Sequence, residues 1–136
     1  MIATIEYLRC ARMVDNKEFD KANLEIGEIS KNDIGMTGIQ STLLYMEQIF
    51  CEILGERREC ILKKMEEKEF CTFVKTMSKI PSVVRVKYAY ELFIKNNMQE
   101  AEKWETRFEK ITRNYPYQGE IECERELMEC CKEYTK

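Results

Sequence analysis

The chain of 136 residues contains no histidine, only two prolines and five glycines, and no long apolar run. Ser-His-Asp and Cys-His catalysis, two-histidine metal sites and Cys₂His₂ zinc fingers all need an imidazole, so the sequence excludes them. The longest uninterrupted apolar run, from Leu43 to Met46, is four residues, far short of the roughly 20 that cross a bilayer. We therefore expect no transmembrane span and no direct membrane insertion.

The seven cysteines do not form a pattern that holds a metal. No Cys-x-x-Cys pair occurs, and the adjacent Cys130 and Cys131 would point about 100° apart on a helix, which is poor geometry for shared chelation. Their number is odd and they lie mostly within apolar patterns, so we expect reduced, buried thiols rather than a disulfide framework. Glu6 and Arg9 interrupt the start of the chain where a secretory signal would be apolar. These features together predict a cytoplasmic protein with no metal site.

Net charge and missing motifs argue against two further classes of function, nucleic-acid binders and enzymes. The 22 Lys and Arg residues against 25 Asp and Glu give a formal net charge of -3, which argues against a general nucleic-acid binder because such proteins need a basic face. Gly35 and Gly38 have no Gly-Lys-Ser/Thr sequel, so no phosphate-binding loop is present. Without histidine, no spacing of acids and bases forces a catalytic cleft. We expect no enzyme activity and no cofactor.

Apolar residues recur at steps of three and four along the whole chain, which predicts an all-α fold. We expect a single helical domain over residues 1–136, built from antiparallel hairpins of seven or eight helices and forming either a repeat array or an irregular bundle. The pattern predicts helices at 2–14, from 18 onward, 39–54, 83–94 and 120–134. After the helix at 83–94, a turn at Asn96-Asn97 leads into a further helix that carries Ala101, Trp104, Phe108 and Ile111. Two stretches, 58–65 and 70–77, are either two short helices or one bent helix.

Capping and helix-breaking residues predict where the helices begin and end. Thr37 is a candidate N-terminal cap within a loop at 32–38, and Gly55 is a C-terminal stop. Pro81 ends one run and opens the next helix, because the residue before proline is disfavoured in the α region. The last helix offers only Ile121, Leu127, Met128, Cys131 and Tyr134 to a core. Its opposite face, with Glu122, Glu126, Glu129 and Glu133, is expected to be solvated.

Two hairpins, residues 5–30 and 84–112, match each other at an offset of 79 residues. This offset superposes Cys10 on Ala89, Met13 on Leu92, Phe19 on Met98, Ala22 on Ala101 and Ile29 on Phe108. The order of small and large apolar positions resembles the tetratricopeptide repeat. Arg9 and Glu105 depart from it, because the family usually has apolar residues there. The resemblance implies a helical array whose curved surface holds an extended peptide or a partner helix.

The predicted partner-binding residues lie on the first helix of the second hairpin. They are Arg85, Lys87, Tyr88 and Glu91, which mix cationic, aromatic and acidic groups as interfaces do. The alternative interpretation places Tyr88 in the core and the charges in solvent. The function predicted is therefore a protein-interaction module that binds a protein or peptide partner. Two other possibilities stay open: a self-associating structural domain such as a homodimer, and the soluble tail of a larger membrane-anchored protein.

Overall fold

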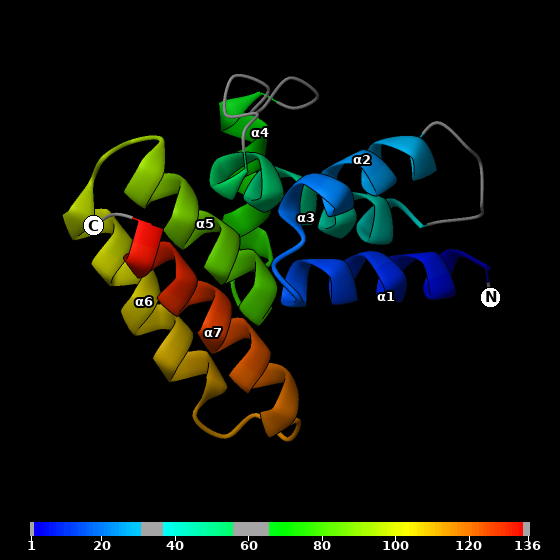
Figure 1. Cartoon of the computed structure of the whole chain (residues 1–136). Coiled ribbons are helices and arrows are strands. Elements are labelled where there is room, and N and C mark those ends of the chain that lie inside the picture. The colour runs from blue at the N-terminus through cyan, green and yellow to red at the C-terminus, as the bar shows by residue number, and fades with distance from the viewer. Residues whose placement is uncertain (1, 31–36, 56–65, 135–136) are drawn as a thin grey trace. The chain divides into compact units, whose positions relative to one another are not determined.

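A computed structural model describes residues 2–30, 37–55 and 66–134, and these ranges hold seven α-helices and no strand (Figure 1). The prediction of an all-α fold is thus confirmed. The helices are α1 (Ile2–Asp15), α2 (Phe19–Ile29), α3 (Gly38–Leu54), α4 (Glu67–Thr76), α5 (Pro81–Phe93), α6 (Met98–Thr112) and α7 (Gln118–Tyr134). The expected loop at 32–38, apart from its last two residues, and the expected helix at 58–65 lie outside the described residues. Within the described ranges, no helix is both long and apolar enough to cross a membrane.

The chain divides into two compact units, residues 1–59 and residues 60–136. The first contains α1 to α3 and the second α4 to α7. The expectation of a single domain over the whole chain stays a prediction.

Local sequence signals fix the helix ends where they were expected. Thr37 accepts a hydrogen bond from the Gln40 amide while the Gln40 side chain accepts one from the Thr37 amide, which makes a capping box at the start of α3. Gly55 ends α3. Pro81 occupies the first turn of α5, and the Asn97 side chain caps α6 by accepting from the Glu100 amide. These caps satisfy helix-end groups that would otherwise lack partners.

The two hairpins predicted from the offset of 79 residues both form, α1 with α2 and α5 with α6. Their turns correspond, because the two non-glycine residues with positive φ among the described residues are Lys17 and Asn96, which are 79 positions apart. Ala22 and Ala101 are both fully buried, so each lets the two helices of its hairpin approach closely. One superposed pair differs: Phe19 is buried, whereas Met98 is 55% exposed.

The first unit packs its hairpin against α3. The Phe19 ring meets the Phe50 ring edge-on with their centroids 5.8 Å apart. Ile26 and Leu44 share a cluster with Cys10. These contacts bury apolar surface from all three helices, which is the main source of stability in such a unit.

In the second unit α5 is the central helix. It packs against α4, α6 and α7, and 11 of its 13 residues are buried. The helix α7 covers it with Ile121, Leu127, Met128, Cys130 and Cys131. Tyr134 was expected in this core but is 47% exposed, at the last residue of α7. The four glutamates predicted on the outer face of α7 are exposed, as expected.

Candidate functional site

The four residues predicted to bind a partner lie in the interior of the second unit. Arg85 is 1% exposed, Lys87 7%, Tyr88 3% and Glu91 8%. They therefore do not line an open groove in this structure, and their charges are not solvated either. The physical reason is the position of α5, which three other helices cover. As a partner-binding set the four residues stay a prediction.

The guanidinium of Arg85 pairs with Glu124 on α7. Its Nε lies 2.6 Å from Glu124 Oε2, and the Glu124 side chain is 16% exposed. A buried cation is tolerated when a carboxylate meets it with good geometry, because the pair offsets part of the desolvation cost. Arg85 thus joins α5 to α7.

Lys87 points the opposite way from Arg85, toward α4. Its ammonium lies 2.7 Å from Glu91 and 3.7 Å from the sulfur of Cys71. It also lies 5.6 Å from the centroid of the Phe70 ring and 5.2 Å from that of Tyr90, within cation–π range. Lys87 and Glu91 are therefore a buried ion pair beside two aromatic rings.

Tyr88 lies on α5 and is buried. Burial raises the pKa of its phenol to about 12, and the nearby Glu105 carboxylate adds to the shift. The neutral phenol is thus the form that the core accommodates. This agrees with the core interpretation of Tyr88.

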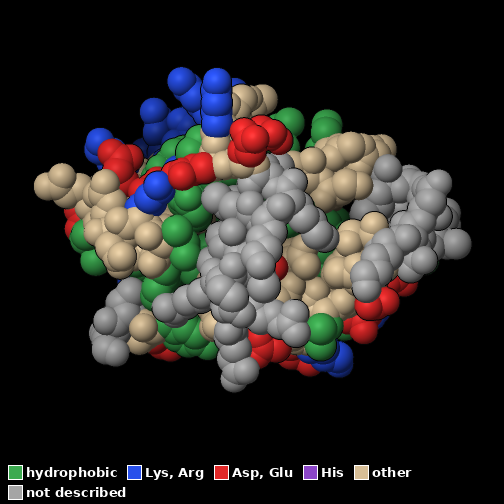
Figure 2. Space-filling model, turned by 90° about the horizontal axis from the view of Figure 1, so that it is seen from above, with side chains coloured by type: hydrophobic (Ala, Val, Ile, Leu, Met, Phe, Trp, Pro, Cys, Tyr) green, Lys and Arg blue, Asp and Glu red, His purple; other side chains and the backbone are tan. Residues whose placement is uncertain are grey.

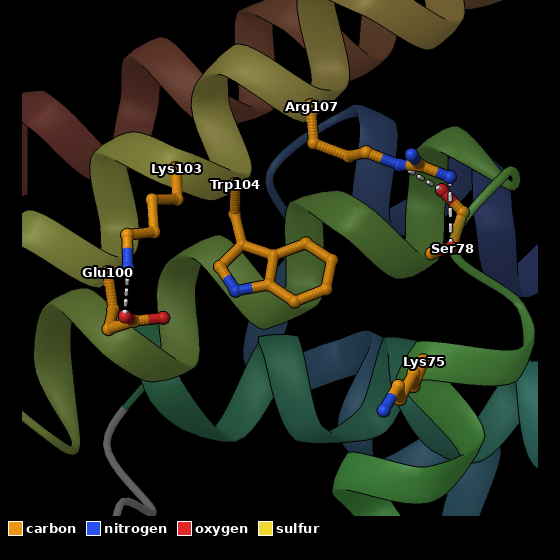
Figure 3. Close-up of a pocket in the computed structure, with 6 residues that line it drawn as sticks. All are labelled: Lys75, Ser78, Glu100, Lys103, Trp104 and Arg107. Atoms are coloured by element: carbon orange, nitrogen blue, oxygen red, sulfur yellow. Dashed lines mark hydrogen bonds and ion pairs between the residues drawn. The ribbon is translucent and has the colours of Figure 1, made fainter.

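A pocket of about 280 Å³ opens between α4 and α6, and it is lined by Lys75, Ser78, Glu100, Lys103, Trp104 and Arg107 (Figure 3). We call it the Trp104 pocket. Four of its residues come from α6 at positions 100, 103, 104 and 107, a spacing that places them on one face of the helix. The Trp104 ring lies between Lys103 and Arg107, and Lys75 faces it from α4.

Arg107 is held in place by the segment that follows α4. Its Nε donates to the Ser78 carbonyl at 3.1 Å and its Nη2 donates to Ser78 Oγ at 3.0 Å. A guanidinium has five N–H donors, so these two bonds fix its plane and leave further donors for a ligand. The side chain is presented in one orientation.

The pocket carries more positive than negative charge. Lys75, Lys103 and Arg107 are cations and Glu100 is the one carboxylate in the lining. Lys103 Nζ lies 2.8 Å from Glu100, and this hydrogen bond raises the pKa of the lysine. On the face drawn in Figure 2, Lys and Arg side chains gather along one edge, with Asp and Glu side chains next to them. A cationic site beside the Trp104 ring suits an anionic ligand that also has an apolar part.

Sequence reasoning placed Trp104 in the core of the second hairpin and so missed this site. Ala101 and Phe108 are indeed buried, but Trp104 is only partly buried. The available signal was the set of charged residues at 100, 103 and 107, which share the tryptophan's face rather than the core face.

Comparisons of the chain with protein-family models, with curated proteins and with solved structures find no match. The resemblance to tetratricopeptide repeats consequently stays a prediction. A helical fold hosts many functions, so the function has to come from the chemistry of a site. Within the described part of the chain, the Trp104 pocket offers such chemistry.

Proposed function

We propose that the chain is a helical protein-interaction module of the cytoplasm, without enzyme activity or cofactor, whose Trp104 pocket binds an acidic segment of a partner protein. The observation that carries the proposal is the combination of Trp104 with three cationic side chains around one pocket. Tryptophan and arginine are the residues most enriched at the energetic centres of protein interfaces. The cations select an acidic partner through charge complementarity.

The hairpin organisation supports the same function. Two hairpins with corresponding turns are what a tetratricopeptide-like array needs, and members of that family bind extended peptides. The proposal differs from the sequence prediction in its location, since it uses the α4–α6 side of the second unit instead of α5. The four buried residues on α5 then have a structural role.

The test is the affinity for a labelled peptide of Glu, Ser and Phe residues, measured by fluorescence anisotropy at low salt. A matched peptide with Gln in place of Glu is the control ligand. We expect Lys103→Glu and Lys75→Glu to weaken binding of the acidic peptide about tenfold or more, because each replaces an attraction by a repulsion.

The matched control variant is Lys21→Glu. Lys21 is an exposed lysine on α2 that pairs with Glu18 three residues earlier, just as Lys103 pairs with Glu100. It changes the net charge by the same amount outside the pocket, so its binding should match that of the wild type. Equal weakening by Lys21→Glu and Lys103→Glu would reduce the effect to overall charge and contradict the proposal. A dimer that binds no acidic peptide would favour the self-associating domain instead.

A further inference from the structure

We infer that the group bound in the Trp104 pocket is a phosphorylated serine or threonine of the partner, an inference that rests on the proposed function and specifies its ligand. The pocket combines two cations that no carboxylate of the described residues neutralises, one of them a guanidinium fixed in orientation, with an aromatic surface beside them. Each of these features favours a phosphate ester in a peptide over a simple carboxylate.

The charge of the lining matches a dianion. Three cations against one carboxylate leave a formal charge of +2. Lys103 is engaged by Glu100, whereas neither Lys75 nor Arg107 has a carboxylate partner among the residues that the structure describes. A phosphorylated side chain carries between about -1.5 and -2 at pH 7, but an aspartate or glutamate carries only -1. A carboxylate would leave one of these cations without a counter-charge.

The geometry suits an anion with three acceptor oxygens. Arg107 is oriented by two hydrogen bonds to Ser78, and its planar fork can donate two parallel bonds to a phosphate. Lys75 comes from α4 and Arg107 from α6, so the pocket offers two cations from different elements (Figure 3). Two N–H groups of the fork and the Lys75 ammonium supply three donors, which match three phosphate oxygens better than two carboxylate oxygens.

The size and the tryptophan indicate a peptide as the source of the phosphate. The pocket volume of about 280 Å³ is larger than a phosphate group alone would fill. The Trp104 ring adds a flat surface on which an apolar or aromatic side chain next to the phosphorylated residue can pack. Free inorganic phosphate would leave this surface uncovered.

The test uses four versions of the Glu-Ser-Phe peptide, in which one serine is kept, phosphorylated, or replaced by Glu or by Gln. We expect the phosphorylated peptide to bind about tenfold more tightly than the Ser and Glu versions, the difference typical of an added charge-assisted contact. Lys75→Gln should remove most of this preference and Lys21→Gln none of it. Arg107→Lys keeps the charge but loses the fork, so it should also reduce the preference.

The pH dependence of peptide binding supplies an independent test for a bound phosphate. The second pKa of a phosphate ester is about 6, and the chain contains no histidine that would titrate in the same range. The charged groups that face the site are Lys75, Lys103, Arg107 and Glu100. Between about pH 7.5 and about pH 5 the preference for the phosphorylated peptide over the Glu peptide should fall as the dianion gains a proton.

Three results would overturn the inference. Equal affinity for the Glu and phosphoserine peptides would remove the phosphate requirement while leaving the proposed function intact. Inorganic phosphate that competes as well as the phosphopeptide would identify a free-anion site, and vesicles containing phosphoinositide that bind more tightly than the peptide would identify a membrane site. Failure of every acidic peptide to bind would contradict the proposed function itself.

Discussion

Charged residues are buried in one part of the second unit and exposed in another. On α5, Arg85, Lys87 and Glu91 are buried and paired inside the helical core. Around the Trp104 pocket, Lys75 and Lys103 are exposed and Arg107 is held by Ser78 at the surface. The difference follows from the number of helices that cover each element, since three pack on α5. Charge and an aromatic ring on a helix therefore identify a binding surface only when the helix has an open side.

The comparison of buried with exposed charges predicts the largest loss of stability for substitution of Arg85. Arg85→Ala removes a fully buried side chain and leaves the Glu124 carboxylate without its partner, so it should lower the free energy of unfolding by about 4 kcal/mol. Lys103→Ala, which removes an exposed cation, should leave it nearly unchanged. Urea unfolding followed by circular dichroism measures both. Similar effects of the two substitutions would break the distinction between the buried and the pocket charges.

A somewhat smaller effect is expected at Lys87. Lys87→Met keeps the apolar stem but leaves Glu91 buried without its cation, which should cost about 3 kcal/mol. The double variant Lys87→Met/Glu91→Met removes both charges and should recover most of the loss, because an apolar pair of similar volume replaces a buried ion pair with little penalty. The double-mutant cycle would contradict this account if the two losses simply added.

The smallest effect is a change in the pH dependence of stability through Tyr88. Burial raises the pKa of its phenol to about 12 in the folded chain, against about 10 in an unfolded one. The contribution of Tyr88 to stability is therefore complete below about pH 10 and is lost as the pH rises toward about 12, because the unfolded state releases the proton first. Tyr88→Phe should flatten the stability profile over this interval. Tyr117→Phe, at a residue that is 64% exposed, should leave the profile unchanged.

Much of the fold could be predicted from local sequence signals. Thr37, Gly55, Pro81 and Asn97 end or begin helices through interactions with neighbouring residues, which a sequence displays directly. The offset of 79 residues also located both hairpins and their turns. These features depend on short stretches of chain, so no knowledge of tertiary packing was needed.

The site could not be predicted in the same way. Whether Lys87 or Lys103 faces solvent depends on which helices cover α5 and α6, and residue type alone does not tell this. Trp104 shares its helix with the buried Ala101 and Phe108, so an apolar pattern assigned it to the core. Lys75 and Ser78 reach the pocket only through the packing of the second unit.

The most direct test of the central claim uses Trp104 itself, because it is the one tryptophan of the chain. Its fluorescence can be followed while the acidic peptide is added at low salt, where screening of the cations is weak. The account predicts a saturable change in emission that the Gln peptide does not cause and that Lys75→Glu weakens. Binding of the acidic peptide with no change in the emission of Trp104 would place the interaction elsewhere and contradict the claim.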